Sequence, residues 1–353
     1  MLAAVYDEFN GPITVRQVPR PQCPSDGVVI AVKATGVCRS DWHGWKGHDS
    51  DIIRHGLPFT PGHEVSGVVV ETCVPDNFAV GDAVAVPFSL SCGCCVQCAE
   101  QQPTVCLQQE QPGFTMPGSF AEYLALPRAV GSLAKIPRGV SFVQAAALGC
   151  RFSTGYRALF QQGQLKPSQS IAIFGCGGLG LSCVMLAAGI GCTTIIAVDV
   201  SARALQKAME LGATHIVDTR GSEDARHCIT SGITQGGVHV SIEASGFADS
   251  CENAVFCTRP RGRVVQVGLV AAQPNIPVGL ITAREIEFVG SHSFDALDLP
   301  KLLNMVASGQ LDPARLVERE VSLASGAKVI EDMDHGSPLG ITMITQFSEK
   351  SRL

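Results

Sequence analysis

The most informative segment of this 353-residue chain is Ile171-Ala172-Ile173-Phe174-Gly175-Cys176-Gly177-Gly178-Leu179-Gly180. Its first four residues predict a buried strand, and the six that follow fit the pattern Gly-x-Gly-x-x-Gly. Residues 181–188 then predict a packed helix. Because the glycines stand between a strand and a helix, they predict a turn that lets a pyrophosphate approach the N–H groups at the start of that helix.

An acidic residue follows the next expected strand, as a dinucleotide site requires. Residues 195–198 are apolar and lead directly into Asp199. A carboxylate at this place accepts hydrogen bonds from the adenosine ribose hydroxyls and repels a 2′-phosphate, so the sequence predicts NAD rather than NADP. The expected contacts of this part of the cofactor site are Gly175, Gly177, Gly178, Leu179, Gly180 and Asp199.

Strands and helices alternate through this half of the chain. A helix is expected over 202–211 with Gly212 as its C-cap, and further strands are expected over 215–217, 238–242 and 264–267. The alternation predicts an α/β fold with a doubly wound parallel sheet. A helix over 299–307 leads into a mixed tail. The first 150 residues instead carry short apolar runs at 28–34, 65–70 and 83–86, separated by Gly, Pro and Asp, which predict an irregular, barrel-like β domain.

The composition excludes several classes of protein. With 46% hydrophobic and 16% charged residues the chain does not resemble a disordered one, and a net charge of −6 offers no basic field to a nucleic acid. No apolar run is long enough to cross a membrane, and no secretory leader is apparent. Fifteen cysteines without an export signal favour a reducing compartment, in which clustered thiols more often bind metal than form disulfides.

Two groups of metal-ligand residues stand out. Cys92, Cys95, Cys98 and Cys106 have the close spacing of a closed, tetrahedral zinc site, although Cys94 in the same run leaves the choice of ligands open. A reactive or disulfide-forming cluster is the alternative. The second group, Cys38, His63 with Glu64, and Cys150, is dispersed along the chain, and none of its members is diagnostic alone.

The order of these motifs resembles that of the medium-chain, zinc-containing alcohol dehydrogenases along essentially the whole chain. The segments that carry the resemblance are Gly36-Val37-Cys38-Arg39-Ser40-Asp41, Gly62-His63-Glu64, the four-cysteine run, Gly149-Cys150-Arg151-Phe152-Ser153-Thr154-Gly155-Tyr156 and the dinucleotide turn. The resemblance implies a GroES-like β-barrel catalytic domain over 1–151 and 295–353, and a Rossmann coenzyme domain over 152–294. It also implies two zinc ions per subunit.

The resemblance assigns a role to each candidate site residue. Cys38, His63 and Cys150 would hold a catalytic zinc with one open position, and the four-cysteine run a structural zinc. Asp41 would orient the His63 ring, Glu64 would lie behind the metal, Ser40 would accept the substrate proton, and His43 would pass it on through the ribose hydroxyl to solvent. The remaining residues implied to contact cofactor or substrate are Arg39, Thr154, Arg203 and Gly268 for the cofactor, and Phe88 and Trp42 for the substrate. Trp42 and Trp45 would either line the substrate pocket or only pack the loop, and the resemblance favours neither role.

The implied activity is reversible hydride transfer between a zinc-bound alcohol or alkoxide and NAD, which gives an aldehyde or ketone. A polyol or sugar dehydrogenase of the same family is an alternative, but such members often replace the third cysteine ligand with an acid, so Cys150 favours simple or aromatic alcohols. A metal-free reductase of the same superfamily would need neither ligand group. A non-catalytic NAD-binding redox sensor is the alternative from another class.

The sequence departs from the family pattern at two places. Ala204 stands where many NAD-using members carry a lysine, with Arg203 beside it, and residues around Ile341 lack an arginine that many members direct toward the pyrophosphate. The segment between Cys106 and Glu122 is short, as in tetrameric microbial members, which favours a homotetramer. A cytoplasmic location is expected. Ser351-Arg352-Leu353 is similar to a peroxisomal address, which would matter only in a eukaryote.

Overall fold

The computed structural model describes residues 1–220, 225–270, 272–336 and 338–347. The Ser351-Arg352-Leu353 tripeptide therefore lies outside the described residues. The chain divides into two compact units, unit 1 with Met1–Ser153 and Ser293–Leu353, and unit 2 with Thr154–His292. Among the described residues there is no helix with the length and apolar character needed to cross a bilayer.

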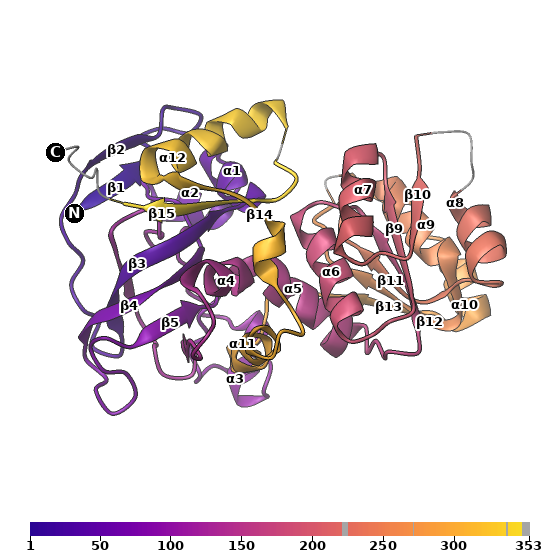
Figure 1. Cartoon of the computed structure of the whole chain (residues 1–353), viewed down its shortest axis with the longest axis horizontal. Coiled ribbons are helices and arrows are strands. Elements are labelled where there is room, and N and C mark those ends of the chain that lie inside the picture. Colours follow the sequence, from indigo (N-terminus) through magenta and orange to yellow (C-terminus); the bar gives the residue numbers. More distant parts are fainter. Residues whose placement is uncertain (221–224, 271, 337, 348–353) are drawn as a thin grey trace. The chain divides into compact units, whose positions relative to one another are not determined.

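Unit 1 is built on a mixed sheet in which strands from both ends of the chain pair with one another (Figure 1). Its central strand β3 pairs on one side with β4 and on the other with β15 and β6, all antiparallel. The strands, in sheet order, are β14 (Val317–Ser322), β15 (Ile341–Gln346), β3 (Val28–Val37), β4 (Glu64–Thr72), β5 (Ala83–Val86) and β7 (Ala134–Lys135), with β6 (Tyr123–Leu126) beside β3. A separate hairpin-like pair joins β1 (Leu2–Val5) and β2 (Thr14–Gln17).

The sheet of unit 1 forms because its apolar runs can be buried. Nine of the ten residues of β3 are buried or half-buried, and Val28, Ile30 and Val32 pack with Val65 and Val69 of β4. The helices of unit 1 are α1 (Arg39–Trp45), α2 (Ser50–His55), α3 (Val96–Ala99), α4 (Phe142–Ala147), α11 (Leu299–Ala307) and α12 (Leu323–Asp332), and α5 (Ser153–Tyr156) begins at its boundary. A π-helical turn, Leu148–Phe152, follows α4 directly.

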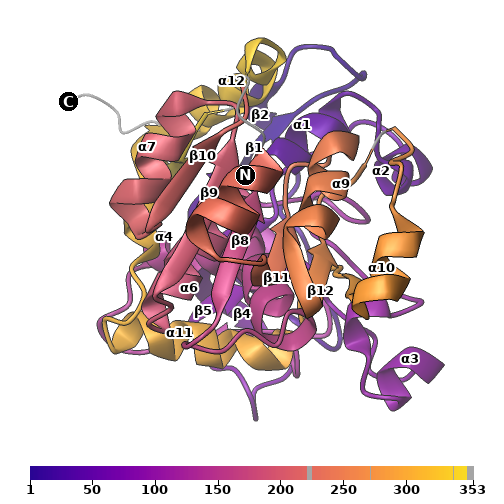
Figure 2. The same ribbon diagram turned by 90° about the vertical axis from the view of Figure 1, so that its right-hand side faces the viewer.

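Unit 2 contains a six-stranded sheet in which every pair of neighbours is parallel. In sheet order the strands are β10 (His215–Asp218), β9 (Thr194–Asp199), β8 (Ser170–Phe174), β11 (Val238–Glu243), β12 (Thr258–Gln266) and β13 (Glu287–Gly290). Figure 2 shows five of these strands side by side, in the order β10, β9, β8, β11 and β12. The helices are α6 (Gly178–Gly189), α7 (Ala202–Leu211), α8 (Ala225–His227), α9 (Ala248–Cys257) and α10 (Val278–Arg284).

The strand order of unit 2 reverses between β8 and β11. From β8 the chain continues to β9 and then to β10 at one edge of the sheet. It then returns to β11, on the other side of β8, and continues to β12 and β13 at the opposite edge. Because such crossovers are right-handed, α6 and α7 cover one face of the sheet and the helices after β10 cover the other. In a doubly wound sheet, ligands bind beyond the carboxyl ends of the strands at this reversal.

The α/β prediction with a barrel-like and a Rossmann part is confirmed by this architecture. Local signals located the elements well: the helix expected over 202–211 is α7, with its first turn capped by the Ser201 hydroxyl and its end at Gly212, whose φ is +120°. Similarly, the helix expected over 299–307 is α11, and the expected strand 83–86 is β5.

The third glycine of the dinucleotide turn makes a close packing contact in unit 2. A Cβ atom on Gly180 would overlap the carbonyl oxygen of Gly175, which lies in the backbone of the turn itself and has no flexible end to move. Gly279, near the start of α10, has room for a side chain, because no atom lies within 4 Å of a Cβ added there.

We expect Gly180→Ala to lower the stability of unit 2 by about 1–3 kcal/mol, the usual cost of forcing an extra methyl into packed structure. Gly279→Ala is the matched control and should leave the melting temperature unchanged or slightly raised. Thermal unfolding followed by circular dichroism measures both. Equal melting temperatures for Gly180→Ala and the wild type would show that the turn can relax.

Candidate active site and metal centres

Four metal-ligand side chains from distant parts of unit 1 converge. The side-chain ligand atoms of Cys38, His63, Glu64 and Cys150 all lie within 4.8 Å of one another. Cys38 stands between β3 and α1, His63 directly precedes β4, Glu64 opens β4, and Cys150 lies in the π-helical turn. The sequence named all four as site residues, and the fold brings them together.

Asp41 connects three parts of this cluster. One carboxylate oxygen, Oδ2, accepts the backbone N–H of Cys38 at 2.8 Å, while Oδ1 accepts the Gly62 N–H at 3.1 Å and lies 2.9 Å from His63 Nδ1. Asp41 and His63 are both buried. With Nδ1 bonded to this carboxylate, the other ring nitrogen of His63 is the one left for a metal, as is common for metal-binding histidines.

The second ring nitrogen of His63 is buried and has no hydrogen-bond partner. Burial by itself would lower the pKa of His63, but the Asp41 carboxylate and the Cys38 sulfur together outweigh burial, and the pKa lies well above its ordinary value. The ring is enclosed by aromatic side chains, with centroid distances of 5.1 Å to Phe114 and 6.4 Å to Phe88. An unpaired buried nitrogen facing two cysteines is the environment expected of a metal ligand.

The two cysteines of the cluster share one hydrogen bond. The Cys150 thiol donates to the Cys38 sulfur, which holds the pKa of Cys38 well below its ordinary value, and the guanidinium of Arg151 adds to this effect. Since the thiolate is the form that binds metal, Cys38 is prepared to act as a ligand. Two sulfurs and one imidazole are donors that suit zinc, and the Glu64 carboxylate lies within the same group of ligand atoms.

A buried ion pair lies directly behind the cluster. Arg151 Nε is 3.3 Å from Glu64 Oε1, and another guanidinium nitrogen of Arg151 donates to the Val37 carbonyl. Burial raises the pKa of Glu64 to about 8, although Arg151 opposes this. A Cβ on Gly36, which faces Glu64 across the β3–β4 pair, would overlap the Glu64 carboxylate, so only glycine leaves room for it.

The four-cysteine segment forms a second cluster. The sulfur–sulfur distances are 3.6 Å for Cys95–Cys98, 3.8 Å for Cys95–Cys106 and 4.0 Å for Cys92–Cys98. Four sulfurs at about 2.3 Å from a tetrahedral zinc are about 3.8 Å apart. Backbone N–H groups of Cys92, Cys95 and Gln108 donate to these sulfurs. The pKa of Cys92 falls to about 6, mainly because backbone N–H groups donate to its sulfur.

The fifth thiol of the segment, Cys94, is exposed and is not part of the cluster. At the base of the segment, Arg128 donates to the carbonyl oxygens of Leu90 and Gln108 and lies 3.8 Å from the Glu110 carboxylate. Leu90 and Glu110 also form a β-bridge. Arg128 therefore joins the two ends of the cysteine segment, a role that the sequence did not indicate.

The first turn of α1 carries the residues expected to contact cofactor and substrate. The Ser40 hydroxyl lies 3.9 Å from the Cys38 sulfur. Arg39 stacks on Trp42, with its guanidinium carbon 3.4 Å from the ring centroid, and donates to the Met333 carbonyl at 2.8 Å. His43 is exposed, with Nδ1 3.2 Å from Nδ1 of His48, and burial together with Arg39 and His48 lowers its pKa.

The two tryptophans of α1 have different environments. Trp45 is buried in the hydrophobic core and its indole donates to the Gly11 carbonyl, so it packs the loop. Trp42 is half-buried, and its indole donates to Asp334 Oδ1 at 2.7 Å, while Lys46 lies 3.2 Å from the other Asp334 oxygen. Asp334 belongs to the short helix after α12, and no sequence motif pointed to it.

In unit 2, the dinucleotide turn has the predicted geometry. Gly175 adopts φ of +94°, and a Cβ there would lie 2.7–2.9 Å from atoms of Ser245. A Cβ on Gly177 would have nothing within 4 Å, which leaves space for a ligand. Gly178 and Leu179 open α6. Asp199 ends β9 and accepts the backbone N–H groups of Cys176 and Ser201.

A second hydrogen-bond network occupies the carboxyl ends of β11 and β12. The buried Glu243 carboxylate accepts from Ser245, Gly246 and the Gln266 amide, and Gln266 also donates to the Gly268 carbonyl. A Cβ on Gly268 would lie too close to Gly246 N and Glu243. This network fixes the backbone at Gly268, a residue named from the sequence, but Glu243 and Gln266 were missed.

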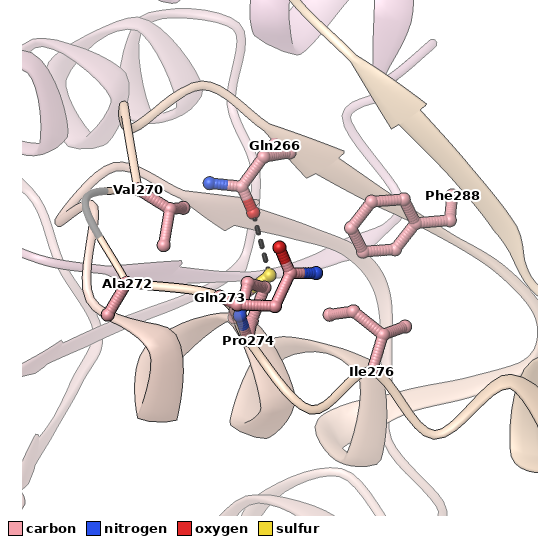
Figure 3. A pocket seen from close by; sticks show the side chains of 8 residues that line it. Gln266, Val270, Ala272, Gln273, Pro274, Ile276 and Phe288 are labelled. Atoms are coloured by element: carbon pink, nitrogen blue, oxygen red, sulfur yellow. Dashed lines mark hydrogen bonds between the residues drawn. The ribbon is translucent and has the colours of Figure 1, made fainter.

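A cavity of about 350 Å³ lies beside Gln266 in unit 2. Figure 3 shows side chains that line it. The Cys251 thiol donates to the Gln266 carbonyl oxygen there at 2.9 Å, and Ile276 and Phe288 supply apolar walls. None of the site residues named from the sequence lines this cavity.

The two remaining residues expected to contact the cofactor differ in exposure. Thr154 is half-buried, and Arg203 is exposed.

The two departures from the family pattern fall on buried positions. Ala204 is 3% exposed at the start of α7, where Ser201 caps the helix, so its side chain faces the core. Ile341 is fully buried in β15. Both side chains are therefore part of the packed interior, whereas Arg203 beside Ala204 is exposed.

Comparison with known proteins identifies the family. Residues 24–138 match the alcohol dehydrogenase GroES-like domain, and 178–308 match the zinc-binding dehydrogenase domain. An alcohol dehydrogenase of Geobacillus stearothermophilus is 34% identical over 88% of this chain and 90% of its own, and a sorbitol dehydrogenase of Bacillus subtilis is 33% identical over 90% of each. Among solved structures, the alcohol dehydrogenase TADH from Thermus sp. ATN1 aligns with a TM-score of 0.91 at 28% identity, covering 98% of this chain and 100% of that one. Taken with the cysteine and histidine clusters and the dinucleotide turn, these likenesses show that the chain belongs to the medium-chain, zinc-containing alcohol dehydrogenase family.

Proposed function

We propose that the protein is an NAD-dependent zinc alcohol dehydrogenase that interconverts an alcohol and the corresponding aldehyde or ketone. The observation that carries the proposal is the convergence of Cys38, His63 and Cys150, with the His63 nitrogen left unpaired. Unit 1 would act as the catalytic domain and unit 2 as the coenzyme domain. A zinc ion held by these three residues would supply the Lewis acidity that lowers the pKa of an alcohol, and NAD would be the hydride acceptor.

The residues around the cluster support the proposed chemistry. Asp41 fixes the His63 ring and the backbone of Cys38, so both ligands keep their orientation through turnover. Ser40, next to the Cys38 sulfur, would take the proton from the substrate hydroxyl, and His43 would carry it away. The Phe88 and Phe114 rings against His63 would exclude water from the reacting centre and contact the carbon chain of the substrate.

The proposed cofactor contacts are the residues named from the sequence, described for each unit separately. Arg39 would meet the pyrophosphate, and its stacking on Trp42 holds the guanidinium in place. The turn Gly175–Gly180 would receive the phosphates at the start of α6, and Asp199 would bind the ribose. Thr154, Arg203 and Gly268 complete the proposed contacts, with Gly268 fixed by the network of Glu243 and Gln266.

A polyol dehydrogenase is the second candidate, and the similarity to a sorbitol dehydrogenase favours it. Cys150 as the third zinc ligand favours simple or aromatic alcohols instead, because polyol dehydrogenases of the family often have an acidic residue at this position. A bound polyol would also need polar partners, whereas the two aromatic rings against His63, those of Phe88 and Phe114, offer no hydrogen-bonding atom. We therefore retain alcohols with apolar or aromatic chains as the leading substrate class.

Two zinc ions per subunit, a homotetramer and a cytoplasmic location belong to the same proposal. The sulfur–sulfur distances in the four-cysteine cluster support the second zinc, and the fifteen free cysteines support a reducing compartment. The homotetramer is supported by the short segment between Cys106 and Glu122, which is similar to that of tetrameric microbial members of the family.

The central test is a panel of primary, secondary, benzylic and polyhydric alcohols assayed with NAD, with Cys38→Ser as the inactive variant. We expect NADH formation with apolar or benzylic alcohols, and a loss of kcat of more than about 100-fold in Cys38→Ser, because removing a ligand should exceed the effect of removing its supporting residues. Cys23→Ser, which alters a half-buried thiol elsewhere in unit 1, is the control. Near-normal turnover by Cys38→Ser would rule out this catalytic centre.

A second test addresses the structural zinc. We expect Cys98→Ser to bring the zinc content down from about two to about one per subunit and to lower the melting temperature, because a closed zinc site contributes folding energy to its segment. Cys94→Ser, in the same segment but outside the cluster, should leave both unchanged. Metal analysis and calorimetry measure these quantities. Equal zinc content in both variants would refute the four-cysteine assignment.

A third test concerns cofactor choice. Asp199→Asn keeps a hydrogen-bond acceptor for the turn but removes the charge, so we expect kcat/KM for NAD to fall by about 10- to 100-fold, as loss of a charged hydrogen-bond partner implies, and the preference to move toward NADP. Asp218→Asn is the control, since Asp218 ends the neighbouring strand β10 and pairs with Arg220. A wild-type enzyme that already prefers NADP would contradict the ribose assignment.

A further inference from the structure

His48 lies outside every motif recognised in the sequence, yet it is in contact with the expected proton carrier. Its Nδ1 is 3.2 Å from Nδ1 of His43, and its backbone N–H donates to the His43 carbonyl at 3.0 Å. Both imidazoles are exposed. The two side chains therefore form one hydrogen-bonded pair at the surface of unit 1.

The position of His48 is held by its surroundings. Trp42 contacts both imidazoles edge-on, with ring-centroid distances of 4.8 Å to His43 and 5.6 Å to His48. Asp334 in turn fixes the Trp42 indole, so three elements of unit 1 set the geometry of the pair. A chance contact between two exposed histidines would lack this support.

The chemistry of two facing Nδ1 atoms restricts what the pair can do. Only one proton can lie between these nitrogens, so one ring donates and the other accepts. Because Nε2 lies on the far side of each ring from Nδ1, each imidazole keeps one nitrogen free for a different partner. We take His43, five residues after Cys38 in the chain, as the inner member of the pair and His48 as the outer member.

We propose that His48 is the outer member of the proton relay, taking the proton from His43 and delivering it to water. This inference rests on the proposed alcohol oxidation, which releases one proton for each alcohol oxidised. The His43 imidazolium gives its Nδ1 proton to neutral His48, and the His48 imidazolium then gives a proton to water or a buffer base. No redox change and no further reactant is involved, and proton exchange with water restores the starting tautomers of the exposed rings.

The charged groups around His43 agree with this direction of transfer. Burial, Arg39 and His48 lower the pKa of His43, whereas Cys38 and Asp49 raise it by smaller amounts. Lys46 and Asp334 are the other charged groups beside Trp42, and they pair with each other. A His43 imidazolium is therefore disfavoured next to Arg39, which promotes release of its proton outward to His48.

The decisive variant is His48→Gln, compared with His55→Gln as the control. His55 is another exposed histidine of unit 1, and it contacts Phe59 rather than His43. At low buffer concentration and pH near 6.5 we expect His48→Gln to lower kcat/KM for alcohol oxidation about tenfold, less than the roughly 100-fold or more of a directly acting base. Added imidazole should restore the rate, and His55→Gln should behave as the wild type.

A measurement that does not depend on activity accompanies the kinetics. Imidazole NMR titration of the zinc-loaded protein follows His43 directly, with His43→Gln used to assign its signals. Removal of the neighbouring charge should raise the pKa of His43 in His48→Gln and leave it unchanged in His55→Gln. An unshifted His43 pKa, or a rate loss in His48→Gln that imidazole does not restore, would overturn the relay. Absence of alcohol oxidation in the wild type would instead refute the proposed function.

Discussion

One buried carboxylate holds the candidate catalytic centre together. Asp41 accepts hydrogen bonds from the Cys38 and Gly62 backbones and from the His63 ring, and so connects the end of β3 to the start of β4. Each of these donors would otherwise be buried without a partner, at a cost of about 1–3 kcal/mol. Two of the three expected zinc ligands therefore depend on a residue that touches no metal. The same carboxylate decides which nitrogen of His63 faces the cysteines.

The charge balance of the site follows from this arrangement. Asp41 and the Cys38 thiolate, whose pKa lies well below its ordinary value, are both buried and bring negative charge into the site. Arg151 is the positive group that the chain itself provides, and it contacts Glu64 directly. Buried charges are tolerated only when paired, so a divalent cation among the sulfurs completes the balance. The π-helical turn makes this possible, because it presents the consecutive residues Cys150 and Arg151 to the same cluster.

Elements with a local signal in the sequence could be predicted, whereas contacts between residues far apart in the chain could not. Helix α7 could be located because Ser201 and Gly212 mark its ends, and the dinucleotide turn because its glycines are consecutive. The pairing of β15 with β3 has no local signal, since it joins residues about 300 positions apart. Phe114, His48 and Asp334 escaped notice for the same reason: each gains its importance from a neighbour that only the folded chain supplies. Arg151 lay within a recognised motif, but its pairing with Glu64 was not foreseen.

The pairing of β15 with β3 also determines when the catalytic unit can be completed during biosynthesis. Unit 2 is one continuous segment, whereas the sheet of unit 1 needs Ile341–Gln346 from the end of the chain. At roughly 5–20 residues per second, the ribosome needs about 10–40 s to travel from the end of the first segment to β15. Throughout that interval the thiols of Cys38 and Cys150 lie in an unfinished barrel, so a supply of metal and a reducing environment matter most while the chain is still being made.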